Sequence, residues 1–282
     1  MNEKAKSRLI DSLLLAMIIV PFLLAILLKV LFKPAEEGIS ITGALIYLEI
    51  PMPLQPLYVT EAMVNSVAVV IALLGLCLYF TRGLTVVPSS KRQVIAEWVV
   101  EKVSGLVEQN MGRKFMGFAP YIAAILGLSA FSSLSSLLGL YPPTADISVI
   151  AGWAIITFTL ITHYKLKGGL WAYIKSFFEP IPFFAPLNII GEVATPVSMS
   201  FRHYGNVMSG AVISTLIAAA MQGLSRSLLG WLPGALSKVP FLQIGLPAVL
   251  SLYFDLFSGC MQAFIFAMLT MLFVAQANPE DD

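Results

Sequence analysis

The stretch VATPVSMSFRHYGNVMSGAVISTLIAAAMQGL, residues 193–224, decides the class of fold because it is long, apolar and carries a single charge, Arg202. A helix needs about 20 mainly apolar residues to cross the ~30 Å hydrocarbon core of a bilayer. The stretch therefore predicts a membrane-spanning helix. If this helix begins near Glu192, Arg202 lies about ten residues further on, roughly 15 Å deep and near the midplane. A charge at that depth is costly and marks a candidate functional site.

The rest of the chain is apolar in the same way. Of its 282 residues 58% are hydrophobic and 12% are charged, whereas a soluble domain has about 25% charged residues. The same numbers exclude a disordered chain, which combines low hydrophobicity with high net charge. We therefore predict an all-α, polytopic membrane protein with about six helices. The other apolar runs cover residues 13–28, 64–80, 115–140, 147–164 and 239–278.

The charges and the rare residues exclude several classes of function. A net charge of +1 gives no basic field for nucleic acid. The chain has two histidines, too few for a multi-histidine metal site. Cys77 and Cys260 stand apart inside apolar runs, which is typical of packing residues. The sequence contains no Gly-x-x-x-x-Gly-Lys phosphate loop, so we expect no nucleotide, metal or other cofactor.

The distribution of Lys and Arg predicts how the chain crosses the membrane. The N-terminus, residues 81–114 and the segment after the fourth run hold most of these side chains, and such segments stay in the cytoplasm. Both termini are therefore predicted to be cytoplasmic. The first run follows a basic start, so a cleaved signal peptide is the alternative to a retained helix. The run is long for a signal peptide and lacks a small-residue cleavage site before Lys33, so we expect a retained helix.

Two shorter segments predict helices on the cytoplasmic surface. Residues 90–109 begin with a Ser-x-x-Gln capping box made by Ser90 and Gln93, and their apolar residues share one face, as in helices that lie in the membrane interface. Residues 168–178 are similar and end before Pro180.

Polar side chains recur at helical spacing in the last two apolar runs. In the fifth run they accompany Arg202, and in the sixth they accompany Asp255, the sole charge between Lys238 and Glu280. Spacings of three and four residues place each set on one helix face. The arrangement favours an aqueous pathway for an ion, and a buried structural Arg202–Asp255 pair is the alternative. The two sets are Thr195, Ser198, Arg202, Asn206 and Ser209, and Ser251, Asp255, Ser258 and Gln262.

The same two helices are longer than a perpendicular crossing requires. As helices, residues 191–222 and 248–276 would extend about 48 Å and about 43 Å, against the ~30 Å of the hydrocarbon core. Such helices either break or tilt. We predict that they form a long, strongly tilted antiparallel hairpin.

Several motifs in a fixed order resemble the signature of subunit a of F-type ATP synthases. Within residues 186–206 the chain reads PLNIIGE, PVS and FRHYGN, where the family shows Pro-x-Asn-x-Ile, Pro-x-Ser and Arg-x-x-Gly-Asn. Residues 137–140 (LLGL), 143–147 (PTADI) and 262–266 (QAFIF) match further pieces. The resemblance covers residues 81–275.

The resemblance implies a non-catalytic stator subunit in a bacterial cell membrane. Its partners would be a rotating ring of c subunits, the b-subunit stalk and the rest of the synthase. Such a subunit offers two half-channels through which H⁺ or Na⁺ reaches and leaves the ring carboxylates. The last two helices would face the ring. The chain would form one membrane domain, residues 1–282, with an additional N-terminal helix and outer loop at 1–62 and the family core at 63–282.

The resemblance also implies that Arg202 stands between the two half-channels. A guanidinium keeps its proton at any relevant pH. Its charge lowers the pKa of a nearby ring carboxylate, so that the carboxylate must release its ion before it passes. The same fixed charge repels cations and blocks direct leakage between the half-channels.

The chain departs from the family pattern along the outer pathway. Ala211 stands where the family often has a glutamate, and Asp255 stands where it often has His or Glu. We expect Asp255 in the outer half-channel and Glu192 at the cytoplasmic exit, with a solvated helix-start carboxylate as the alternative for Glu192. His203 is either a channel group or a packing residue with a local hydrogen bond. Further lining of the outer half-channel is expected from Asn206, Gln262 and Asp146.

Two other functions compete with this interpretation. A secondary transporter with its own substrate site would favour an internal repeat and broken helices at matching positions, and the sequence shows no such repeat. A purely structural scaffold would not need Arg202 in an otherwise uncharged helix. The choice between H⁺ and Na⁺ depends mainly on the c ring and is not predicted.

Overall fold

The computed structural model describes residues 3–32, 43–53, 55–86, 90–179, 181–229, 242, 245–246, 249–250 and 252–277. Six helical spans in these residues are long and apolar enough to cross a membrane. They are Ala5–Phe32, Glu61–Thr81, Arg113–Leu138, Ile147–Lys167, Pro182–Leu228 and Leu252–Gln276. The prediction of an all-α, polytopic membrane protein with about six helices is thus confirmed.

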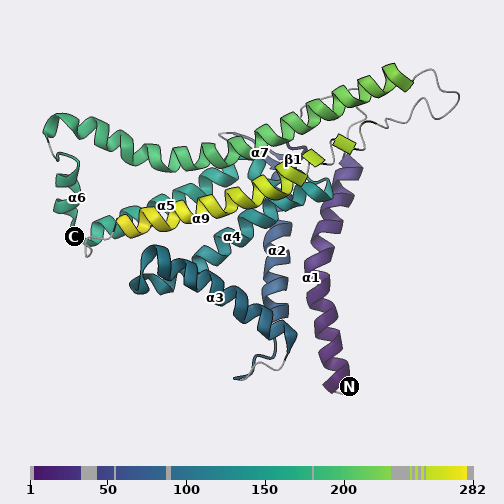
Figure 1. Ribbon diagram of the computed structural model, residues 1–282, viewed down its shortest axis with the longest axis horizontal. Helices are drawn as coiled ribbons and strands as arrows, with labels where there is room; N and C mark the ends of the chain where they lie inside the picture. The colour runs from purple at the N-terminus through teal and green to yellow at the C-terminus, as the bar shows by residue number, and fades with distance from the viewer. Residues whose placement is uncertain are drawn as a thin grey trace.

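The long helices fall into two orientations (Figure 1). Two of them, α1 and α2, pack side by side, whereas α5, α7 and α9 run across them (Figure 1). The long helices are α1 (Glu3–Phe32), α2 (Glu61–Thr81), α4 (Ala119–Leu134), α5 (Ile147–Lys167), α7 (Ala185–Leu229) and α9 (Gly259–Gln276). The shorter elements are β1 (Ile46–Ile50), β2 (Leu57–Thr60), α3 (Lys91–Met111), η1 (Arg113–Phe118), η2 (Ser135–Leu138), η3 (Pro143–Ala145), α6 (Leu170–Ser176), η4 (Pro182–Phe184) and the π-helical segment η6 (Leu252–Ser258).

The core lies around α9, which packs against α3, α4, α5 and α7. Buried residues make up 44% of the most apolar part of the span Leu252–Gln276, but only 6% in the span Pro182–Leu228. α7 therefore lies at the edge of the bundle and leaves most of its surface to the surroundings. The buried apolar cluster includes Val107, Ile122, Ile150, Phe266, Ala267 and Met271.

Small residues allow the central helices to approach closely. A Cβ added to Gly259 would lie 2.7 Å from the Cβ of Ser133 on α4, and one added to Gly210 on α7 would lie 3.0 Å from the ring of Phe254. Without a hydrophobic force between helices in lipid, such contacts between small residues are a main source of association. They place η6 and the start of α9 between α4 and α7.

Ion pairs hold α1 along α2 at both ends. Near one end Lys29 Nζ lies 2.9 Å from Oε1 of Glu61, whose side chain is only 2% exposed. Near the other end Asp11 Oδ1 lies 2.8 Å from Arg82 and 3.2 Å from Arg92. α1 is therefore an integrated part of the bundle. The division into an N-terminal part, residues 1–62, and a core, residues 63–282, within one membrane domain stays a prediction.

The surface helices are formed near the predicted positions. α3 begins one residue after Ser90, whose hydroxyl accepts a hydrogen bond from Gln93 N at 3.3 Å. The Gln93 side chain does not complete the predicted reciprocal box, because it bonds the backbone of Thr85 instead. α6 covers the middle of the predicted 168–178 segment.

Other features differ from the sequence-based expectation. The antiparallel β1–β2 hairpin was not predicted. α7 begins at Ala185 rather than at 193, because Asn188 Nδ2 donates to the carbonyls of Phe177 and Glu179 and fixes the first turn. In the sixth run, much of the stretch before Leu252, including Ser251, lies outside the described residues.

Candidate functional site

The middle of α7 has two distinct faces. Ser198, Arg202, Asn206 and Ser209 are exposed, and Thr195 is half-buried. We call these five residues the polar stripe. An adjoining face buries Met199, Ser200, His203 and Gly210. Four of the five stripe residues are therefore open to the surroundings of the chain.

Arg202 forms no ion pair with a carboxylate in the described part of the chain. The structural Arg202–Asp255 pair considered from the sequence is therefore not made there. An exposed guanidinium on a membrane-spanning helix is costly in lipid. It is stabilised if a carboxylate of a partner protein meets it.

A groove between α7 and α9 leads to Arg202. Its volume is about 240 Å³, and its lining includes Arg202, Ser198, Thr195 and Phe273. A second cavity of about 230 Å³ shares Thr195 and Phe273 with the groove. The two hollows thus adjoin, and together they run from Arg202 toward one end of α5.

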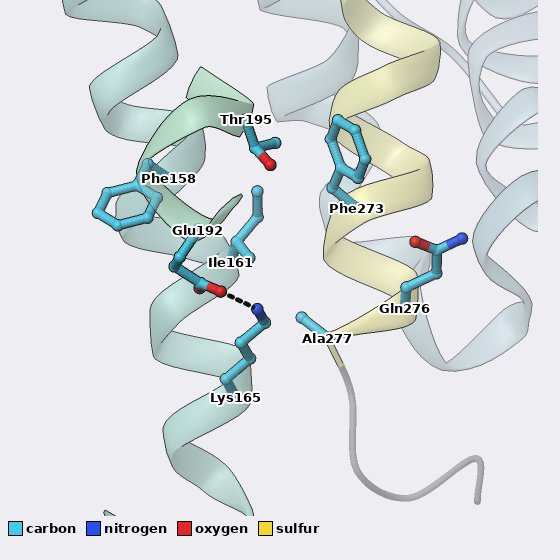
Figure 2. Close-up of a pocket in the computed structure, with 8 residues that line it drawn as sticks. All are labelled: Phe158, Ile161, Lys165, Glu192, Thr195, Phe273, Gln276 and Ala277. Atoms are coloured by element: carbon cyan, nitrogen blue, oxygen red, sulfur yellow. Dashed lines mark hydrogen bonds and ion pairs between the residues drawn. The ribbon is translucent and has the colours of Figure 1, made fainter. Parts of the chain in front are cut away.

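An ion pair forms part of the lining of the second cavity. Lys165 from α5 and Glu192 from α7 lie next to each other on one side of it, with Nζ 2.6 Å from Oε2 (Figure 2). The Glu192 side chain is 14% exposed, and within the described chain its other oxygen, Oε1, has no hydrogen-bond partner. The cavity is therefore lined by a mostly buried carboxylate that is paired with a lysine.

Tyr173 of α6 stands close to this pair. Burial, followed by the negative charge of Glu192, raises the pKa of Tyr173 above its ordinary value. A tyrosine with a raised pKa stays neutral at physiological pH, so the charges at this end of the cavity are those of Lys165 and Glu192.

Asp255 lies in the π-helical segment η6 and is half-buried. This segment contacts α7, α9, α4 and η2. Its neighbour Phe254 packs on Gly210 of α7, one turn beyond Asn206. The structure thus brings the segment that carries Asp255 against α7.

The other predicted site residues have different surroundings. Asp146 caps α5 by accepting a hydrogen bond from Ser148 N at 2.9 Å. Gln262 is buried in α9 at 3% exposure. His203 is 1% exposed, and its Nε2 lies 3.3 Å from the hydroxyl of Ser129 on α4. These three residues do not meet Arg202 in one cavity within the described part of the chain, and their roles in translocation stay predictions.

Two residues that matter for this geometry were not singled out from the sequence. Lys165 belongs to the basic segment after the fourth run that predicts the topology. Nothing in its local sequence indicates a partner 27 residues away. Ser129 belongs to a run of hydroxyl residues at spacings of three and four in an apolar helix, a signal that could have been used. Ser129, Ser132 and Ser133 are all buried.

Comparisons with known proteins point to one family. A family model described as the ATP synthase A chain matches residues 62–275. ATP synthase subunit a of Moorella thermoacetica is 31% identical over 224 residues, covering 79% of this chain and 92% of the relative. The Bacillus subtilis subunit a is 31% identical over 79% of this chain and 93% of its own. A relative from Propionigenium modestum named "ATP synthase subunit a, sodium ion specific" is 30% identical over 77% of this chain and 73% of its own.

The family match covers nearly all of α2 to α9 and includes Arg202, the polar stripe, the groove beside Arg202 and most of the lining of the second cavity, while α1 lies before it. This extent and the identity to full-length relatives show the family. The chain belongs to the ATP synthase subunit a family.

Proposed function

We propose that this chain is the ion-translocating stator subunit of a rotary ATP synthase, with Arg202 between two half-channels. Membership of the family makes it a non-catalytic membrane subunit of the F-type synthase and leaves the secondary-transporter alternative without support. The observation that carries the proposal is the exposed polar stripe of α7, in which Arg202 has no carboxylate partner among the described residues.

The ring of c subunits is the partner that this stripe fits. A ring carboxylate that arrives opposite Arg202 would find a permanent positive charge in a water-poor setting, where the attraction is strong. The carboxylate then loses its ion, because the charged form is stabilised by the guanidinium. The polar side chains of Ser198 and Asn206 in the stripe would coordinate the ion, or water bound to it, as it moves.

The two adjoining cavities support an inner half-channel. They connect Arg202 with the Lys165–Glu192 pair by way of Thr195. Lysines and arginines near this end of α5 and on α3 favour a cytoplasmic position. We therefore place Glu192 at the cytoplasmic exit, with both termini inside a bacterial cell membrane.

The outer half-channel is proposed to involve Asp255. Ala211 provides no carboxylate on α7, and η6 brings Asp255 against that helix instead. Asn206, Gln262 and Asp146 are its proposed polar lining. The ion carried is H⁺ or Na⁺, and the choice depends mainly on the c ring. The b-subunit stalk and the rest of the synthase complete the proposed set of partners.

Replacing the arginine tests the proposal. We expect Arg202→Ala to abolish ion-driven ATP synthesis in membrane vesicles while the complex still assembles, because the exposed side chain supports no packing of its own chain. Arg202→Lys should also fail largely, since a lysine loses its proton more readily in an apolar site. Arg226→Ala is the matched control, an exposed arginine further along α7. Most of the wild-type rate remaining in Arg202→Ala would overturn the assignment.

A further inference from the structure

His203 follows Arg202 directly in the sequence, but its side chain is buried, at 1% exposure, whereas that of Arg202 is exposed. Successive residues of an α-helix are about 100° apart around its axis. The direction of Arg202 is therefore fixed by whatever fixes the direction of its neighbour.

Four helices meet at the imidazole ring. His203 Nε2 lies 3.3 Å from Oγ of Ser129 on α4, a residue with no exposed surface. The ring also meets Trp153 of α5 edge-on, with centroids 6.4 Å apart, and Phe266 of α9, with centroids 5.8 Å apart. The side chain is thus enclosed by aromatic edges and held by one polar contact.

The rest of the buried face of α7 offers less control over rotation. Met199 is flexible and adapts to many packings, and Gly210 has no side chain. Ser200 bonds its own helix, at the carbonyl of Pro196. The bonds of Asn188 and Glu192 to neighbouring elements lie in the first turns of α7. Among the buried residues of α7 that the structure describes, His203 is the one whose side chain makes a hydrogen bond to another helix.

We propose that His203 is a positioning residue that fixes the rotation of α7 through its hydrogen bond to Ser129, so that Arg202 and the polar stripe face the c ring. The inference rests on the proposed function, because it assumes that the stripe meets the ring. Apolar contacts tolerate rotation, whereas a buried hydrogen bond is satisfied in one arrangement. Buried polar residues set the register of coiled coils in the same way.

The alternative rotations are costly. A turn of α7 by one residue would bring Arg202 toward the apolar rings of Trp153 and Phe266 and would expose the imidazole to lipid. Without the hydrogen bond, the native rotation of α7 is favoured less over other rotations. The polar stripe then faces a range of directions rather than one. A reacting group displaced by about 1 Å can lower a rate by about 100-fold.

Three variants of the assembled synthase test the proposal. His203→Leu removes the bond but keeps apolar bulk, Ser129→Ala removes the partner, and His203→Gln keeps a side-chain donor and acceptor. We expect ATP synthesis in vesicles to fall roughly 10- to 100-fold in the first two and to be partly restored in the third. Ser132→Ala is the matched control, since Ser132 is an equally buried serine on α4 at 2% exposure whose loss should change synthesis little.

The rotation itself is read by disulfide cross-linking to a cysteine on the outer surface of the c ring, after Cys77 and Cys260 are replaced. Single cysteines are placed on α7 at Ser209, in the stripe, and at Ser200, on the buried face. His203→Leu and Ser129→Ala should lower the cross-linking yield at 209 relative to that at 200, and His203→Gln should restore it.

Unchanged cross-linking, with or without a loss of synthesis, would overturn the proposal, because the rotation of α7 would then not depend on the bond. If His203→Leu fails to assemble, the Ser129→Ala complex decides by the same two measurements. Failure of the proposed function looks different, because synthesis would then survive Arg202→Ala whatever the cross-linking shows.

Discussion

Glu192 lines the second cavity, where it pairs with Lys165 and lies close to Tyr173. Its Oε2 binds Lys165, and its Oε1 has no hydrogen-bond partner in the described part of the chain. A carboxylate of this kind can attract a cation or pass on a proton without giving up its structural contact. The arrangement separates the two tasks between two oxygens of one side chain.

We therefore expect Glu192→Gln to lower ion-driven ATP synthesis, by roughly tenfold or more, because an amide carries no proton and leaves the Lys165 charge unpaired in the exit. Proton flux and synthesis in vesicles measure the effect. Glu179→Gln is the control, since Glu179 forms a solvent-exposed pair with Lys175 at 3.6 Å, and such pairs contribute little. Equal rates in both variants would remove Glu192 from the pathway.

Among the elements, α1 stands out because it lies outside the family match yet pairs with charges at both ends of α2, Glu61 and Arg82. Glu61 begins α2 and also accepts a hydrogen bond from Tyr141 N at 3.0 Å. Asn65, one turn later, donates to the Tyr141 carbonyl at 2.8 Å. Lys29 therefore neutralises a carboxylate that fixes the loop before η3. This dependence favours a retained α1 over a cleaved signal peptide.

Breaking this contact should destabilise the bundle. Lys29→Leu leaves Glu61 buried without its counter-charge, which costs roughly 3 kcal/mol for a buried pair. We expect a lower midpoint of thermal unfolding for the complex in detergent. Adding Glu61→Gln should recover most of the loss, because no charge then remains buried. A single variant as stable as the wild type, or a mature chain whose intact mass lacks residues 3–32, would contradict the role given to α1.

The shape of the whole molecule follows from two directions of helix. α7 has 45 residues and would extend about 68 Å, more than twice the ~30 Å hydrocarbon core. Since α7 and α9 run across α1 and α2 (Figure 1), the two pairs cannot both stand along the membrane normal. We infer that α1 and α2 are the upright pair and that α7 and α9 are the tilted one.

This inference predicts where the chain meets each side of the membrane. Lys102→Cys on α3 should react with an impermeant maleimide from the cytoplasmic side, and Ser148→Cys at the start of α5 from the outer side. Both positions are exposed. In the assembled synthase, α7 and α9 should lie well away from the normal. Tilts within about 20° for both helices, or reversed labelling, would refute the arrangement.

The sequence predicts the helices of this molecule better than its contacts. Long apolar runs specify spans because backbone groups in lipid must bond within the segment. The periodicity placed Arg202, Asn206 and Ser209 on one face, but it could not tell that this face is exposed, because that depends on what packs behind α7. The Lys165–Glu192 pair joins two helices and has no local signature. The β1–β2 hairpin and the π-helical turn at Asp255 depend on tertiary contacts for the same reason.

The order of the ion pairs along the chain has a consequence for biogenesis. Asp11 and Lys29 leave the ribosome before their partners Arg82 and Glu61, so α1 is already in the bilayer when α2 enters the translocon. A carboxylate and a guanidinium at the ends of α2 would otherwise oppose its release into lipid. With α1 already in place, α2 can enter the bilayer beside it and its terminal charges find their partners there, and the later helices assemble against this pair.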